Sequence, residues 1–167
     1  MSISSSKHCF CYLGNYLCTM KIEEAINTKF ISEQQKAIVN IRYTSNWLSG
    51  IQNSFMKKYD LTMPQFNVLR ILRGAKESIN VQKIKDRMVE KSPNLTRLID
   101  KLESKQFLSR SNASNDKRTI LVSITAEGLN VLDRIDIDLK NEDFFNLNLS
   151  DQEANTLSNL LDKVRNT

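Results

Sequence analysis

The sequence predicts a mainly helical fold that carries one small β-hairpin. Residues 119–125 read Thr-Ile-Leu-Val-Ser-Ile-Thr, and the apolar side chains of Val122 and Ile124 alternate with their neighbours, which is typical of a half-buried strand. Over most of the remaining chain, apolar residues recur at helical spacing. With 167 residues, 40% of them apolar, and only four glycines and two prolines, we expect one compact domain.

A charged turn precedes this strand and completes the predicted hairpin. Residues 115–118 read Asn-Asp-Lys-Arg, and residues 108–111 form a shorter run of polar and apolar residues that can pair with the strand. Thr125, directly before Ala126 and Glu127, is a typical N-cap of the helix that follows. A hairpin with such a tip fits against a phosphate backbone, although these residues alone are equally consistent with an ordinary surface hairpin.

Two short helices are predicted upstream of the hairpin, in the arrangement of a helix-turn-helix. Asn80 is the expected cap of the first helix, and Ser92, followed by Pro93, is the expected cap of the second, which ends near Lys105. One face of each helix is apolar and is expected to face a core. These apolar positions are Val81, Ile84, Met88, Leu95, Leu98, Ile99 and Leu102.

The opposite face of the second helix offers hydrogen-bonding and cationic side chains. They are Ser92, Asn94, Thr96, Arg97, Asp100 and Lys101. The N-terminal end of such a helix enters the major groove of DNA, where arginine can pair with guanine and asparagine with adenine. A polar helix face by itself is more often simply solvated, but a charged hairpin directly after it favours a winged helix-turn-helix.

Taken in this order, the segments resemble the MarR family of bacterial winged-helix transcription regulators. The resemblance rests on helices at 62–73, 80–89 and 92–105, on Arg110, and on the spacing Asp116-x-Arg118-x-x-x-Val122-x-Ile124-Thr125-x-x-Gly128. It extends over about residues 30–165. One departure follows the second helix of the pair: the family has glycine in a Lys-Gly-Leu type turn, and this chain has Lys105-Gln106-Phe107. Gln106 must therefore either accept a positive φ or turn differently.

The resemblance implies a regulator that binds double-stranded DNA sequence-specifically. We expect a ligand-responsive repressor that acts as a homodimer on a pseudo-palindromic operator, with half-sites about 34 Å apart. The expected DNA-binding residues are Ser92, Asn94, Thr96 and Arg97 in the major groove, Lys101 on phosphate, and Lys117 and Arg118 in the adjacent minor groove, with Asp116 bracing the wing arginine by analogy with the family.

Charge is distributed as a DNA-binding protein requires. Residues 62–125 hold 13 Lys and Arg against 6 Asp and Glu, residues 1–61 hold 7 against 4, and residues 126–167 hold 4 against 9. The positive charge is therefore concentrated in the segment that would touch DNA, whereas the C-terminal segment is acidic. This asymmetry is the electrostatic footprint of a nucleic-acid-binding module.

The segments on either side of the winged helix, which spans about residues 62–125, are also helical. Between Ile31 and Phe55 an imperfect heptad stripe predicts one long amphipathic helix. The pattern continues after Thr125, and a last helix opens with the capping box Ser150-x-x-Glu153. We expect one domain over residues 20–167, with dimerisation helices at about 28–58 and 126–166, as the resemblance implies. A monomeric helical cap is the alternative.

The resemblance also implies a small, often aromatic or phenolic effector that binds between the dimerisation helices and the DNA-binding lobe. Arg42, Tyr43 and Trp47 lie on the long helix, the two aromatic residues one turn apart, and we expect them to line that pocket. The alternative is that Tyr43 and Trp47 pack in the core of the dimer.

The N-terminal segment 1–19 differs from the rest of the chain. It holds the only histidine, His8, and all three cysteines, Cys9, Cys11 and Cys18. Their compressed spacing is unlike that of usual zinc ligands, and Lys7 is the only nearby cation that would lower a thiol pKa. We expect a disordered extension or a start upstream of the native one at Met20. A zinc site and a redox-sensing thiol, which some relatives in the family have, are the alternatives.

The sequence contains no nucleophile elbow, Walker loop, glycine-rich phosphate loop or HExxH pattern. We therefore expect neither an enzyme nor a protein with a cofactor or metal. No apolar run approaches the length of about 18 residues that spans a membrane, and we expect a cytoplasmic protein. Two other functions are considered: a regulator switched by its N-terminal thiols, and a winged helix that binds proteins instead of DNA, which predicts a neutral or acidic recognition face.

Overall fold

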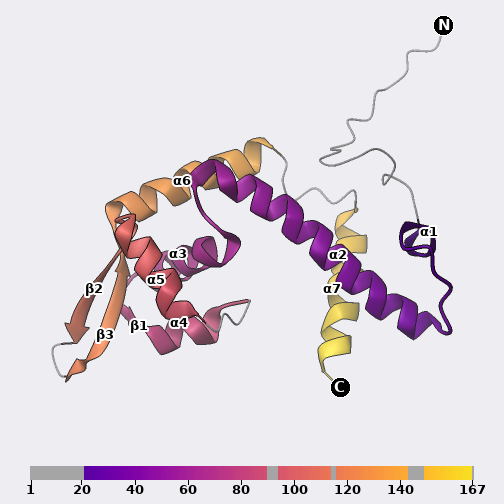
Figure 1. Cartoon of the computed structure of the whole chain (residues 1–167), viewed down its shortest axis with the longest axis horizontal. Coiled ribbons are helices and arrows are strands. Elements are labelled where there is room, and N and C mark those ends of the chain that lie inside the picture. Colours follow the sequence, from indigo (N-terminus) through magenta and orange to yellow (C-terminus); the bar gives the residue numbers. More distant parts are fainter. Residues whose placement is uncertain (1–20, 90–93, 114–115, 143–148, 167) are drawn as a thin grey trace, which may run out of the picture. The chain divides into compact units, whose positions relative to one another are not determined.

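The computed structural model describes residues 21–89, 94–113, 116–142 and 149–166, and for residues 116–118 it describes the backbone alone. The chain divides into two compact units, Met1–Met63 and Pro64–Thr167 (Figure 1). The expectations for segment 1–19, including those for His8 and the three cysteines, lie outside the described residues.

From residue 21 on, where the structure describes it, the first unit contains a short helix, a long helix and a 3-10 turn. These are α1 (Ile22–Ala25), α2 (Glu33–Met56) and η1 (Lys57–Tyr59). The side chain of Ser32 accepts a hydrogen bond from the Gln35 N–H, so the long helix begins at Glu33. A Glu23–Lys36 ion pair joins α1 to α2, and the hydrogen bond from Lys36 lowers the pKa of the Glu23 carboxyl. The long helix expected between Ile31 and Phe55 is thus present.

The second unit contains the helix-turn-helix and the helices that follow it. They are α3 (Met63–Ala75), α4 (Val81–Arg87), α5 (Leu95–Ser104), α6 (Ala126–Asn141) and α7 (Asp151–Arg165). Three predicted caps are confirmed: the side chain of Asn80 accepts a hydrogen bond from the Lys83 N–H, that of Thr125 from the Gly128 N–H, and Ser150 with Glu153 forms a capping box.

The start of α5 differs from the expected one. Asn94 has φ −115° and ψ 40° and makes no side-chain cap, so the helix begins at Leu95 instead of Pro93. The expected cap, Ser92, lies outside the described residues together with Pro93.

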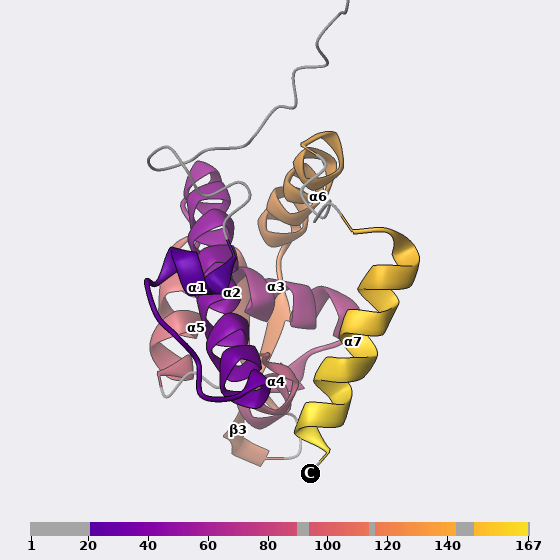
Figure 2. The ribbon, with the colours of Figure 1, turned by 90° about the vertical axis from the view of Figure 1, so that its right-hand side faces the viewer.

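Three antiparallel strands form a sheet in the order β1-β3-β2. The strands β2 (Leu108–Ala113) and β3 (Asp116–Ile124) are the predicted hairpin. In Figure 1 the two strands lie side by side and run away from the start of α6, and in Figure 2 part of β3 is seen below α4. Arg110 pairs with Val122, and the register shifts between Asn112 and Ala113. The third strand, β1 (Ile79–Asn80), was not predicted, because two residues are too short to display an alternating pattern.

The core of the second unit lies where the helices meet the sheet. Its most deeply buried side chains are Val68, Leu69, Leu72, Ile79, Ile84, Ile99, Leu102, Leu108, Val122, Leu132 and Ile135. The apolar face predicted for the helix pair is therefore largely confirmed. Two of its members, Val81 and Leu98, are only half-buried, because they lie at the edge of that face. Within the described part of the chain, no helix is both long and apolar enough to cross a bilayer.

Candidate nucleic-acid interface

The helix α5 presents two very different faces. Leu95, Ile99 and Leu102 are buried against the core, whereas Thr96, Arg97 and Lys101 on the other side are exposed. Neither Arg97 nor Lys101 forms an ion pair with any residue that the structure describes. Their positive charges are therefore available to an anionic partner. Asn94, directly before the helix, is also exposed.

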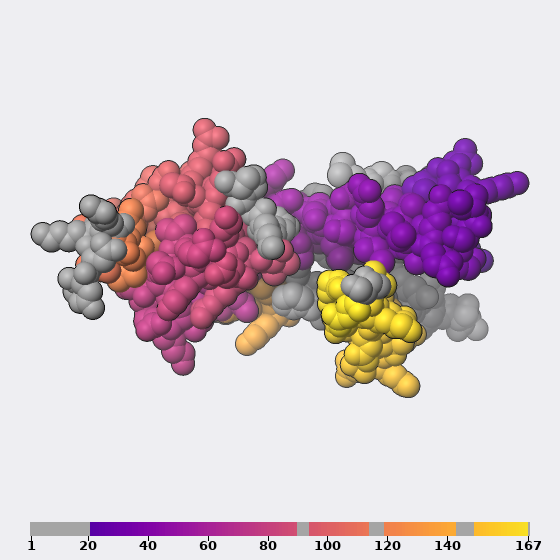
Figure 3. Space-filling model, turned by 90° about the horizontal axis from the view of Figure 1, so that it is seen from below, coloured from indigo at the N-terminus to yellow at the C-terminus, as the bar shows by residue number. Residues whose placement is uncertain are grey.

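This face adjoins the hairpin, which we call the wing (Leu108–Ile124). In Figure 3 the surfaces of α4 (magenta) and α5 (pink) meet on one side of the unit, and the strands of the wing (orange) lie next to them. Contacts between α4 and α5 and between α5 and β2 hold this arrangement. A helix face and a hairpin in this relation can engage adjacent grooves of one DNA duplex.

The expected wing-tip residues fall at the start of β3. Asp116 pairs with Ala113 across the hairpin, and residues 117 and 118 follow it in the strand. The side chains of Asp116, Lys117 and Arg118 lie outside the structural description, as does Ser92 entirely. Their DNA contacts, and the bracing role of Asp116, stay predictions.

A group of charged residues links the wing to α5. The guanidinium of Arg110, on β2, pairs with the carboxylates of Asp100 and Glu103 on α5, with Nη1 3.1 Å from Glu103 Oε2. From the sequence, Asp100 was expected on the DNA-facing side, without a partner. Its spacing from Glu103, three residues along a helix, does put both carboxylates on one face, but only the folded chain brings Arg110 to them.

The turn after α5 resolves the alternative that the sequence left open at Gln106. Its φ is 61°, in the left-handed region. The Phe107 N–H donates to the Leu102 carbonyl at 3.0 Å, and the Gln106 N–H to the Glu103 carbonyl at 2.8 Å. These two bonds form a Schellman motif, which usually places glycine at the left-handed position. The chain thus makes the turn typical of glycine with a glutamine.

The start of α6 packs closely against this turn. A Cβ added to Gly128 would lie 2.1 Å from the Phe107 carbonyl oxygen and 2.8 Å from Cγ1 of Ile124. Only glycine fits at such a distance from a backbone oxygen, which gives a physical reason for the glycine that ends the wing motif.

Ion pairs also connect α3 to α6 in the second unit. Arg73 lies 2.7 Å from Asp136 and 3.5 Å from Asp133, and Arg70 lies 3.2 Å from Asp136, each measured from nitrogen to oxygen. This network could not be predicted from the sequence because its members are far apart along the chain. It ties the first helix of the DNA-binding unit to the helix that follows the wing.

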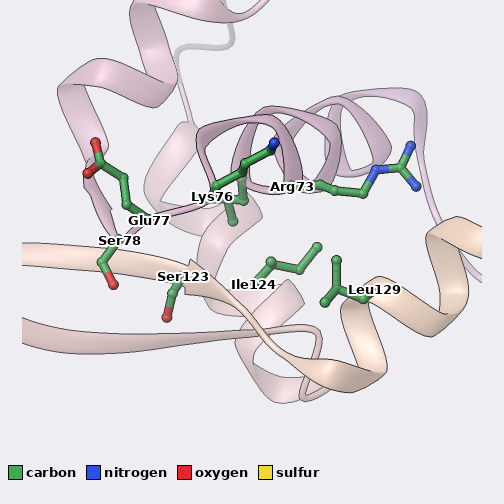
Figure 4. Close-up of a pocket in the computed structure, with 8 residues that line it drawn as sticks. Arg73, Lys76, Glu77, Ser78, Ser123, Ile124 and Leu129 are labelled. Atoms are coloured by element: carbon green, nitrogen blue, oxygen red, sulfur yellow. The ribbon is translucent and has the colours of Figure 1, made fainter.

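The residues expected to bind an effector lie on α2, in the first unit. Arg42 and Trp47 are exposed, with Trp47 51% accessible, and Tyr43 is half-buried. None of them lines the cavity of about 450 Å³ in the second unit, where Leu72, Lys76, Ser78 and other residues meet the end of β3. In Figure 4 the side chains of Ile124 and Leu129 point toward one another there, and Arg73 extends away from them. The effector-binding assignment stays a prediction.

Comparisons with known proteins agree with this fold. The sequence model of the MarR family matches residues 61–120. The HTH-type transcriptional regulator SarZ of Staphylococcus aureus is 31% identical over 116 residues, covering 68% of this chain and 73% of SarZ. A MarR mutant from E. coli, solved in complex with operator DNA, is 27% identical with a TM-score of 0.70, covering 82% of this chain and 99% of that one.

A MarR-like transcription regulator from Bacillus cereus shares the fold, with a TM-score of 0.70 at 23% identity over 80% of this chain and 96% of that one. The chain belongs to the MarR family. It is a transcription regulator with a DNA-binding winged helix, and proteins of this family are transcription factors, not enzymes. The resemblance and the fold class predicted from the sequence are confirmed.

Proposed function

We propose that the protein is a homodimeric repressor that binds a pseudo-palindromic operator and responds to a small effector. The observation that carries this proposal is the exposed cationic face of α5 beside the wing, where Arg97 and Lys101 form no ion pair with the residues that the structure describes. The E. coli relative in complex with operator DNA supports it further. A scaffold that binds only proteins would not need two exposed cations on this face.

The DNA contacts follow from the order of side chains along α5. Near its N-terminal end, Asn94, Thr96 and Arg97 are exposed and suited to base edges and phosphates. We propose a similar contact for Ser92, which lies outside the described residues. Lys101, about one turn later, is better placed for a phosphate. At the wing, Lys117 and Arg118 would reach the adjacent minor groove, with Asp116 holding Arg118.

Exposed apolar side chains support the homodimer. No residue of α7 is buried, yet Leu157, Leu160 and Val164 form an apolar stripe and are 45%, 57% and 58% exposed. On α2, Ile38 and Trp47 are exposed as well. Helices with apolar stripes normally bury them, and a second copy of the chain is the partner that symmetric association provides.

The effector proposal rests on α2. Tyr43 and Trp47 offer two aromatic surfaces one turn apart, and Arg42 supplies a cation beside them. An aromatic acid would match this combination of stacking surface and charge.

The first test is selection of genomic fragments by the purified protein, followed by binding measurements over a salt series. Arg118→Ala removes a charge close to phosphate, so we expect the slope of log K against log salt to fall by about one unit. Lys163→Ala, on α7 and outside the proposed contacts, serves as the matched control and should keep the slope of the parent. Equal slopes for Arg118→Ala and the parent would remove the wing from the interface.

A further inference from the structure

Arg110 joins the two elements that the proposed function places on DNA. It lies in the wing on β2, and its two terminal nitrogens contact two different carboxylates of α5, those of Asp100 and Glu103. The side chain of Arg110 is only 27% exposed, whereas those of Asp100 and Glu103 are 53% and 40% exposed. The arginine is therefore held between strand and helix instead of extending into solvent.

A contact at two points constrains more than a contact at one. Asp100 and Glu103 are separated by about one helical turn. The planar guanidinium donates a hydrogen bond to Asp100 and forms an ion pair with Glu103, so its fixed fork contacts both carboxylates. Such a contact limits both sliding of α5 along β2 and its rotation about the helix axis. Lysine carries the same charge but lacks the fork, so it cannot reproduce this constraint.

The charges also argue for a positioning role. Asp100 is on the same helix as Arg97 and Lys101, whose side chains are proposed to approach phosphates. A carboxylate there repels DNA, since like charges raise the energy of the complex. Two carboxylates beside one arginine leave the group with an excess negative charge, so direct attraction to phosphate does not account for it.

We propose that Arg110, Asp100 and Glu103 form a clamp that fixes the orientation of α5 relative to the wing. This inference rests on the proposed function. As a consequence, α5 and the wing are already correctly oriented before DNA binds. The major-groove contacts of α5 and the minor-groove contacts of the wing can then form together at one half-site. The three residues are positioning residues, and they need not touch DNA themselves.

The decisive experiment compares two double variants that each remove two negative charges. Asp100→Asn/Glu103→Gln dismantles the clamp, and Glu77→Gln/Glu127→Gln, at exposed positions of the same unit, is the matched control. Affinity is measured by fluorescence anisotropy on a genomic fragment selected with the parent protein and on a random-sequence duplex of the same length. Electrostatics alone predicts that both variants bind the fragment more tightly than the parent.

The clamp predicts the opposite change in affinity for the first variant, namely weaker binding of the selected fragment. We expect Asp100→Asn/Glu103→Gln to bind the selected fragment about tenfold more weakly and the random duplex no more weakly, so that its specificity ratio falls about tenfold. The control should bind both duplexes at least as well as the parent. Equal or tighter binding of the fragment by the clamp variant would overturn the inference.

If the double variant does not fold, it will lose binding to both duplexes and also lose its circular dichroism signal. Single substitutions at Arg110 then provide the test. Arg110→Lys keeps the charge, and the clamp predicts weaker fragment binding with an unchanged salt slope. Parent-like affinity for Arg110→Lys would identify Arg110 as a simple phosphate contact. If the parent protein itself selects no genomic fragment, the proposed function is wrong. If the parent binds a fragment and the variants bind it equally well, only the clamp is overturned.

Discussion

The hydroxyl of Thr125 donates a hydrogen bond to the carbonyl oxygen of Gln106 at 2.6 Å. The same hydroxyl accepts a hydrogen bond from the Gly128 N–H at 3.1 Å. One side chain thereby hydrogen-bonds a carbonyl in the turn that ends α5 and an N–H in the first turn of α6. The Thr125 N–H also donates to the Phe107 carbonyl at 3.2 Å, so the end of α5, the wing and α6 meet at a single junction.

Replacing this hydroxyl should weaken the junction. Thr125→Val keeps the shape of the side chain but leaves the Gly128 N–H and the Gln106 carbonyl without this partner, and we expect a loss of about 1–2 kcal/mol in the free energy of unfolding. Urea denaturation followed by circular dichroism measures it. Thr125→Ser retains the hydroxyl, so its free energy of unfolding should fall much less. An equal fall for the two variants would show that the hydroxyl contributes little to stability.

Gly128 and Gly74 form a matched pair for the effect of a methyl group. At Gly128 a Cβ would meet the Phe107 carbonyl oxygen at 2.1 Å, whereas at Gly74, on α3, it would meet nothing within 4 Å. We expect Gly128→Ala to destabilise the protein by at least about 1–3 kcal/mol. Gly74→Ala should be neutral or stabilising by up to about 1 kcal/mol. A parent-like midpoint in urea for Gly128→Ala would contradict the close approach.

Gln106 is expected to carry a backbone cost that glycine would relieve. A residue other than glycine at φ 61° is disfavoured by about 1–2 kcal/mol. Glycine avoids this backbone strain, but the greater conformational freedom of its unfolded chain offsets part of the gain in stability. Gln106→Gly should therefore raise the free energy of unfolding by about 0.5–1 kcal/mol. Gln106→Ala shortens the side chain without relieving the backbone and should give no gain, so a gain for alanine as large as that for glycine would exclude this explanation.

The homodimer proposal makes a quantitative prediction for α7. Leu160 is 57% exposed, and a lysine in its place would lie in the proposed interface. Because a twofold interface contains each substitution twice, Leu160→Lys should raise the dimer dissociation constant at least about a hundredfold. Analytical ultracentrifugation over a concentration series measures this constant. Asn159→Lys adds the same charge on the opposite face and should leave it nearly unchanged, and a parent-like constant for Leu160→Lys would exclude this stripe from the interface.

Part of the interface could be derived from the sequence because it depends on neighbouring residues. The exposure of Thr96, Arg97 and Lys101 follows from the helical period that buries Ile99 and Leu102. Burial of Val122 follows likewise from the alternation along β3. The roles of these exposed side chains on DNA stay predictions, because exposure alone does not determine what they bind.

The sequence by itself determined the longer helices, three of their caps and the hairpin. Asn80, Thr125 and Ser150 could be recognised as caps because they act on N–H groups within the next three residues. The tertiary structure alone decided which carboxylates Arg110 contacts, that β1 joins the sheet, and that Gly128 lies against Phe107. The apolar positions of helices and strands recur with the period of the backbone, and caps act on residues close by in the chain, so both can be recognised in a sequence. Contacts between distant residues depend on how the elements pack, and no periodic pattern encodes that.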